Sequence, residues 1–275
     1  MDGAGDIPKN WKAEYNVHVI PINIHFENKR LQQGVDPSDD DFYHIVETSG
    51  VIPKTSQPTP QQFVDFFNRL AQTSDTIFSL HVTGKLSGTY NSAVLAAQEI
   101  RNILNIIIFD SGSGSAAMGF MCKEARQLEK AGASLQAIIK RLEVIRNNLN
   151  IILNLDTLEY ARRSGRVNAL SAVLAAVVKN KPVVILKDSA LDMGEKVRTR
   201  QRAINRVLEI IHEQVGDRLI NVAVVHSQSL DAAKDLLRKV RETFQVNEVI
   251  LSDLSIAIVA NLGPRTIGIV AYAES

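Results

Sequence analysis

The sequence predicts an α/β protein of two domains: an N-terminal parallel-sheet α/β domain over residues 1–150 and a C-terminal α+β domain with a largely antiparallel sheet over residues 151–275. Up to about residue 150, short apolar runs typical of buried strands alternate with helical patterns, the order that produces a parallel sheet. Beyond that point strands cluster with few helices between them, which favours an antiparallel arrangement. A ligand is expected between the two domains, where pockets commonly form.

Composition argues against several broad classes of protein. Lys and Arg number 31 against 30 Asp and Glu, so net charge gives no reason to expect a nucleic-acid partner. The single cysteine, Cys122, cannot form an internal disulfide and suits a reducing cytoplasm. It lies on an apolar helical stripe, which predicts a core residue rather than a nucleophile. No apolar run is long enough to span a bilayer, so a cytoplasmic protein without stable membrane insertion is expected.

The first elements of the N-terminal domain are marked by loops and prolines. Residues Met1–Pro8 have the composition of a loop that follows a strand, so the first strand of the domain is expected to be missing. Strand Val17–Phe26 is interrupted by Pro21, which favours an edge or a bulge. The Pro-rich loop Val51–Pro60 is rigid, and it could either position a ligand or simply connect two elements.

The expected helices of this domain follow from caps and apolar stripes. They are a helix capped by Pro37–Asp39 that runs through Val46, a helix from Gln61 to Gln72, a helix from Ala93, a helix carrying Met118 to Leu128 that stops near Gly132, and a helix from Ser134.

Two loops rich in serine and glycine follow predicted buried strands. Residues Lys85–Ser92 follow strand Ile77–Val82, and residues Asp110–Ser115 follow strand Asn105–Phe109. Each loop precedes a helix, whose free N–H groups and dipole favour a carboxylate or a phosphate. A Ser/Thr helix cap is the commoner explanation of any single turn of this kind. In parallel sheets both loops would lie at the ligand-binding edge.

The C-terminal domain is expected to begin with strand Ile151–Leu155 and a short helix that closes on a basic turn at Arg162–Arg166. The almost entirely apolar segment Val167–Val178 predicts a buried helix or the lining of an apolar cavity. The remaining expected elements are hairpin strands Val183–Leu186 and Met193–Val197, helices Arg200–Gln214 and Leu230–Phe244, and strands Ile220–His226, Val249–Leu251, Ile256–Ala260 and Ile267–Tyr272.

An ordered set of short motifs resembles the DegV family of bacterial fatty-acid-binding proteins across essentially the whole chain. The motifs are Lys54-Thr55-Ser56-Gln57-Pro58, Lys85-Leu86-Ser87-Gly88-Thr89-Tyr90, Asp110-Ser111, Leu155-Asp156-Thr157-Leu158-Glu159-Tyr160, Ser164-Gly165-Arg166, Asn180-Lys181-Pro182, Glu195-Lys196-Val197-Arg198 and Gly263-Pro264. Each motif is weak alone, but their order is specific.

The resemblance implies a long-chain fatty acid in an apolar tunnel, with its carboxylate held by the hydroxyls of Thr55 and Ser87. It further implies presentation of the acid to a separate fatty-acid kinase that uses ATP, while this chain itself is non-catalytic and carries no cofactor or metal. Arg166 matches the family's basic position near the head group, although a solvated charge is an equal alternative. Further head-group or partner candidates are Ser56, Gly88, Thr89, Ser111 and Asn261.

Three departures from the family pattern concern the head-group region. The family's first strand and its Thr-Asp-Ser turn are missing or reduced to Met1–Gly3. Asn261 replaces a histidine and cannot carry a charge. Arg265 replaces a glycine where the backbone requires glycine-like freedom. These departures predict a weaker or altered head-group site.

Two other functions are alternatives for this sequence. A serine-dependent esterase would use Ser87 with His81 or His226 as the base, but Ser87 lacks the G-x-S-x-G context of a nucleophile elbow. A lipid-responsive regulatory protein without a carrier role is the other alternative. The sequence contains no nucleotide-binding glycine motif, so ATP or NAD binding by this chain is not expected.

Overall fold

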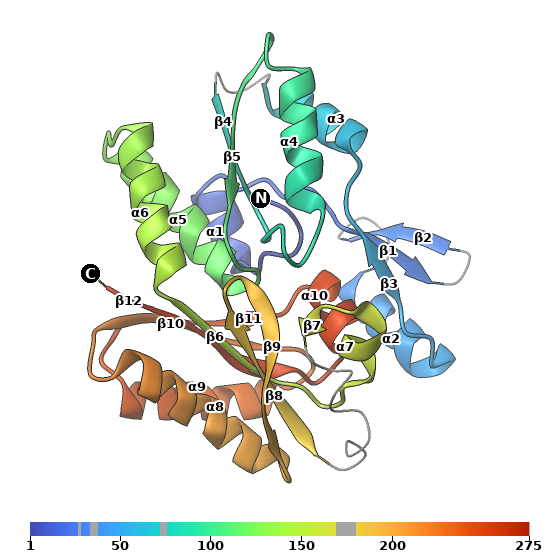
Figure 1. Ribbon diagram of the computed structural model, residues 1–275, viewed down its shortest axis with the longest axis vertical. Helices are drawn as coiled ribbons and strands as arrows, with labels where there is room; N and C mark the ends of the chain where they lie inside the picture. Colours follow the sequence, from blue (N-terminus) through green and yellow to red (C-terminus); the bar gives the residue numbers. More distant parts are fainter. Residues whose placement is uncertain (27–28, 34–37, 72–75, 169–179, 275) are drawn as a thin grey trace.

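The computed structural model describes residues 1–26, 29–33, 38–71, 76–168 and 180–274. Figure 1 shows a large sheet with two helices beneath it and a smaller α/β part above it, which contains the N-terminus. In the described segments, no helix is both long enough and apolar enough to cross a lipid bilayer.

The helices are α1 (Lys9–Glu14), α2 (Asp39–Ser49), α3 (Pro60–Ala71), α4 (Thr89–Glu99), α5 (Ala116–Lys130), α6 (Leu135–Asn147), α7 (Glu159–Ser164), α8 (Arg200–Val215), α9 (Leu230–Thr243) and α10 (Ile256–Leu262). The strands are β1 (Asn23–Phe26), β2 (Lys29–Gln32), β3 (Lys54–Ser56), β4 (Thr76–His81), β5 (Asn105–Asp110), β6 (Leu149–Asn154), β7 (Val167–Asn168), β8 (Lys181–Lys187), β9 (Ala190–Val197), β10 (Ile220–His226), β11 (Val246–Asp253) and β12 (Ile267–Ala273).

The large sheet has the strand order β11-β10-β12-β6-β8-β9-β7. The pairs β10–β11 and β7–β9 are parallel, and the other four pairs are antiparallel. This confirms the prediction of a C-terminal α+β part with a largely antiparallel sheet.

Alternate residues of the large sheet enter two different cores, as the two-residue period of a strand requires. Ile152 of β6 and Ile269 of β12 pack in a cluster with α8 and α9. Leu153 and Val270, their neighbours in the same strands, pack on the opposite face with α5 and α10. Helices α8 and α9 therefore cover one face, and the N-terminal half together with α10 covers the other (Figure 1).

The N-terminal half combines two small sheets. Strands β4 and β5 are parallel, with Thr76 opposite Asn105 and His81 opposite Asp110, as the alternating pattern predicts. Strands β2, β1 and β3 form a separate antiparallel sheet that the sequence did not reveal. The proposed domain boundary near residue 150 stays a prediction.

Three elements differ from the expected ones. Residues 256–260 form helix α10 rather than a strand: Ile256, Val259 and Ala260 are buried at helical spacing. The first strand is shorter than Val17–Phe26, because regular pairing begins only at Asn23, after Pro21. The predicted helix over 167–178 begins instead as strand β7 at Val167–Asn168, and its remainder lies outside the described residues.

A groove runs along β4. Residues 76–80 and residues 16–18 line it, together with Asn105 at the start of β5. Between these two segments lies Met1, whose amino group donates to the carbonyl of His18 at 2.8 Å. Asp2 then forms a parallel bridge with Ile20 and accepts a hydrogen bond from the Val82 N–H. In the described structure, β4 pairs with β5 alone.

Candidate functional site

A cavity of about 110 Å³, partly open to solvent, lies between the large sheet and the N-terminal half. Its apolar wall consists of Ala4, Ile22, Val82, Leu86, Ile151, Leu153, Leu186, Leu191, Ala257, Ile258 and Leu262. Thr55, Ser87, Ser115, Arg166 and Asn261 supply polar side chains to the same cavity. An apolar chamber with a few hydroxyl and amide groups suits an amphiphilic ligand.

Thr55 and Asn261 meet directly at this cavity. Thr55 lies on β3 opposite Ile24 of β1, and Asn261 lies in the last turn of α10. The side-chain amide of Asn261 donates to the Thr55 hydroxyl at 3.2 Å and to the carbonyl of Ala257 at 2.7 Å. The amide thereby fixes the position of the hydroxyl while leaving both groups on the cavity wall.

Ser87 comes from the loop after β4. Its hydroxyl lies 2.8 Å from that of Thr89 and accepts a hydrogen bond from the Thr89 N–H at 3.3 Å, at the start of α4. Gln57 packs closely over Gly88, where an added Cβ would lie 2.2 Å from the Gln57 side-chain oxygen. This close packing holds the segments carrying Thr55 and Ser87 next to each other.

Arg166 reaches the cavity from the turn after α7. Its guanidinium donates to the carbonyl of Ser164, and the Ser164 hydroxyl donates to the carbonyl of Asn261 at 3.2 Å. The basic side chain is therefore connected to the end of α10. This arrangement places one positive charge beside the hydroxyl and amide groups of the cavity.

The other candidates lie outside the cavity wall. Ser56 is exposed and hydrogen-bonds His25 at 2.8 Å, which fits the alternation of side chains along β3. Ser111 is fully buried and donates to the carbonyl of Ser113. Thr89 is buried behind Ser87, and Gly88 lies beneath Gln57. Thr89 and Gly88 can thus act on a ligand only indirectly, by positioning Ser87.

A buried carboxyl group joins three segments behind the cavity. Asp6 accepts hydrogen bonds from the Ser115 hydroxyl at 2.5 Å and from the Ser255 N–H at 2.8 Å. Ser115 precedes α5, and Ser255 precedes α10. Burial raises the pKa of Asp6 to about 7, against the opposing effect of these hydrogen bonds. This group ties the N-terminal loop to both helices.

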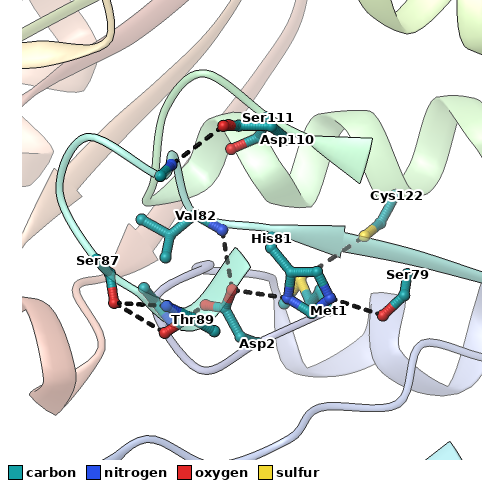
Figure 2. Close-up of polar contacts among 12 residues, drawn as sticks. Met1, Asp2, Ser79, His81, Val82, Ser87, Thr89, Asp110, Ser111 and Cys122 are labelled. Carbon is teal, nitrogen blue, oxygen red and sulfur yellow. Dashed lines mark hydrogen bonds and ion pairs between the residues drawn. The ribbon is translucent and has the colours of Figure 1, made fainter. Parts of the chain in front are cut away.

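The geometry does not assemble a serine hydrolase at Ser87. His81 is buried and bonds Ser79 at 2.8 Å and Asp2 at 3.1 Å, whereas Ser87 bonds Thr89 (Figure 2). Burial lowers the pKa of His81, which keeps the ring neutral near pH 7. His226, the other candidate base, faces Asp253 at 3.5 Å. In the part of the chain that the structure describes, neither imidazole is among the hydrogen-bond partners of the Ser87 hydroxyl. The described residues therefore do not pair Ser87 with a base that could activate it as a nucleophile.

Sequence reasoning missed most of the cavity wall. Ala257, Ile258 and Leu262 line the cavity because residues 256–262 are helical. Leu186 and Leu191, which are paired across the hairpin β8–β9, line it as well. Ser255 before an apolar run and Gly263-Pro264 after it are typical helix boundary signals and could have revealed α10. Over the described ranges, no cluster of three or more His, Cys, Asp or Glu side chains is placed to hold a metal.

Comparison with known proteins agrees with this architecture. The family model for an uncharacterised protein of the DegV family, COG1307, matches residues 1–274. A DegV domain-containing protein of Halalkalibacterium halodurans is 33% identical over 269 residues, which cover 97% of this chain and 94% of the relative.

Solved structures show the same likeness. A DegV family protein from Thermus thermophilus, described by its fatty acid binding, superposes with a TM-score of 0.91 at 28% identity, covering 99% of this chain and 98% of the other. DegV of Bacillus subtilis, described as a fatty acid binding protein, superposes with a TM-score of 0.88 at 27% identity, covering 99% and 97%. With its sequence matched from residue 1 to residue 274 and its fold shared with these structures, the chain belongs to the DegV family.

Proposed function

We propose that this chain binds a long-chain fatty acid, with the acyl chain in the cavity and the carboxylate at Thr55 and Ser87. The observation that carries the proposal is the combination of an extended apolar wall with two hydroxyls and one amide in a single chamber. Solved relatives described as fatty acid binding proteins support the same assignment.

The physical chemistry of the cavity supports this ligand class. Each methylene removed from water contributes about 0.8 kcal/mol, so a chain of about sixteen carbons can supply most of the affinity. Hydroxyl donors at Thr55 and Ser87 form charge-assisted hydrogen bonds with a carboxylate, which are stronger than neutral ones. Asn261 and Arg166 lie on the same wall and can add a further donor and a positive charge.

The same proposal assigns the chain a carrier role. The side chains at the proposed carboxylate site are only half-buried, so the ligand carboxylate would be accessible from outside. A non-catalytic protein can in this way present the carboxylate to a separate kinase that uses ATP. Arg166, with part of its side chain exposed at the cavity, would then lie where a transferred phosphoryl group needs positive charge. The setting would be the cytoplasm, where fatty acid and ATP are both available.

The first test is native mass spectrometry of the purified chain, followed by solvent extraction and identification of its lipid. A stoichiometric fatty acid is the expected result. A chain that carries no lipid and takes up neither palmitate nor oleate would contradict the proposal. Formation of acyl-phosphate after addition of a fatty-acid kinase and ATP would separate a carrier from a lipid-responsive regulator.

A further inference from the structure

The hairpin β8–β9 reaches from the large sheet to the N-terminal half. Figure 1 shows it rising toward the lower ends of β4 and β5. Its two-residue turn, Asp188–Ser189, has φ values of +48° and +62°, the conformation of a tight hairpin turn. Immediately before and after this turn region, Leu186 and Leu191 form a cross-strand pair and line the cavity. The hairpin is thus one wall of the chamber.

Lys85 connects the hairpin wall of the cavity to the wall formed by the loop after β4. The Lys85 ammonium donates to the backbone carbonyl of Asp188 at 2.8 Å. Lys85 belongs to the loop that also carries Leu86 and Ser87, both of which line the cavity. This hydrogen bond therefore joins the two walls of the cavity.

The hairpin turn packs against the loops that follow β4 and β5, and hydrogen bonds join these two loops to each other. The Thr83 N–H donates to the carbonyl of Ser113 at 2.9 Å, which joins the loop after β4 to the loop after β5. The Gly84 N–H donates to the Asp110 carboxylate at 3.1 Å and strengthens this connection. An added Cβ at Gly112 would lie 3.1 Å from the Ser189 hydroxyl, so the turn packs closely against the second loop.

We propose that Lys85 and the β8–β9 turn form a clasp that controls the rate at which ligand enters and leaves the cavity. This inference rests on the proposed function, since it takes a fatty acid as the ligand. When the Lys85–Asp188 bond breaks, the hairpin turn can lift from the two loops and carry Leu186 and Leu191 away from the chamber. Because the bond involves no ligand atom, it slows entry and exit to the same extent.

The experiment compares Lys85→Met with the matched control Lys187→Met. Lys187 is exposed and directly precedes the turn, so the control removes a neighbouring charge while leaving Lys85 in place. Stopped-flow fluorescence with cis-parinaric acid measures association and dissociation rate constants. In Lys85→Met both should rise by about fivefold, the effect of one solvent-exposed hydrogen bond, while Kd stays within about twofold. In Lys187→Met both rates should match the parent chain.

Hydrogen exchange of the amides from Leu186 to Leu191, measured without ligand, tests the clasp independently of fatty acid binding. Faster exchange in Lys85→Met alone is expected. Unchanged exchange, or a weaker Kd caused by faster dissociation alone, would overturn the clasp. If the parent chain bound no fatty acid but its hairpin exchanged faster in Lys85→Met, the proposed function would fail while the clasp contact itself would stand.

Discussion

The side chain of Asn261 donates a hydrogen bond to the hydroxyl of Thr55 at 3.2 Å, although 206 positions separate the two residues in the sequence. The contact joins β3 of the small antiparallel sheet to the last turn of α10. Both side chains line the cavity. Their hydrogen bond holds the two polar groups in fixed positions relative to each other. A neutral amide at this position can donate to a carboxylate without requiring a proton from solution.

The change Asn261→Asp is expected to weaken fatty acid binding by about tenfold or more at pH 8, because it places a like charge beside the ligand carboxylate. Titration with a fluorescent fatty acid measures the effect. Since a carboxylate is neutralised by protons, the loss should diminish as the pH is lowered toward 5. Equal affinities of the two chains at pH 8 would show that Asn261 does not face the head group.

The double change Thr55→Val and Ser87→Ala removes both hydroxyls with little change in volume. Each charge-assisted hydrogen bond contributes about 1.5–3 kcal/mol, so the loss of two should lower fatty acid affinity by about 100-fold or more. Isothermal titration with palmitate measures it. The control Ser56→Ala removes the adjacent exposed hydroxyl and should bind like the parent chain. An unchanged affinity in a folded double variant would remove the proposed carboxylate site.

The two serine-rich loops could be located from sequence, whereas Asn261 could not be placed. The loops follow β4 and β5, and the geometry of a parallel pair brings the carboxyl ends of neighbouring strands together. The position of Asn261 depends on whether residues 256–260 form a helix or a strand, and a short, entirely apolar run does not distinguish the two. Burial of the segment on several sides stabilises the helix, and only tertiary packing supplies that information.

Residue Arg265 has φ of +60°, which confirms the expectation that its backbone adopts a glycine-like conformation. A residue with a Cβ loses about 1–2 kcal/mol of stability in this left-handed conformation. Part of that cost is offset, because an unfolded chain with arginine at this position is less flexible than one with glycine. Arg265→Gly should therefore raise the free energy of unfolding by about 0.5–1 kcal/mol in urea denaturation. Arg265→Ala, which removes the charge but keeps a Cβ, should give no such gain. Equal stabilisation by both changes would assign the effect to charge instead.

Asp6 links the N-terminal loop to the starts of α5 and α10, and its environment makes that link dependent on pH. Its pKa is about 7 in the folded chain, compared with 3.8 for an unperturbed aspartate. Between these two values the folded chain retains a proton that the unfolded chain has released. The free energy of unfolding must therefore fall as the pH rises from about 4 to about 7, and then level off.

Asp6→Asn should remove most of this pH dependence, because an amide keeps an acceptor oxygen for Ser115 and Ser255 but does not titrate. The change in the free energy of unfolding that Asp6 contributes between pH 4 and pH 7 is about 4 kcal/mol at most, from the difference between the two pKa values. Urea unfolding at intervals from pH 4 to pH 8 measures it in both chains. Asp217→Asn is the control, since Asp217 is exposed and its replacement should leave the profile of the parent chain. If the Asp6→Asn profile kept the parent's slope between pH 4 and pH 7, Asp6 would not be the titrating group, and the contacts of Ser115 and Ser255 with it would be independent of pH.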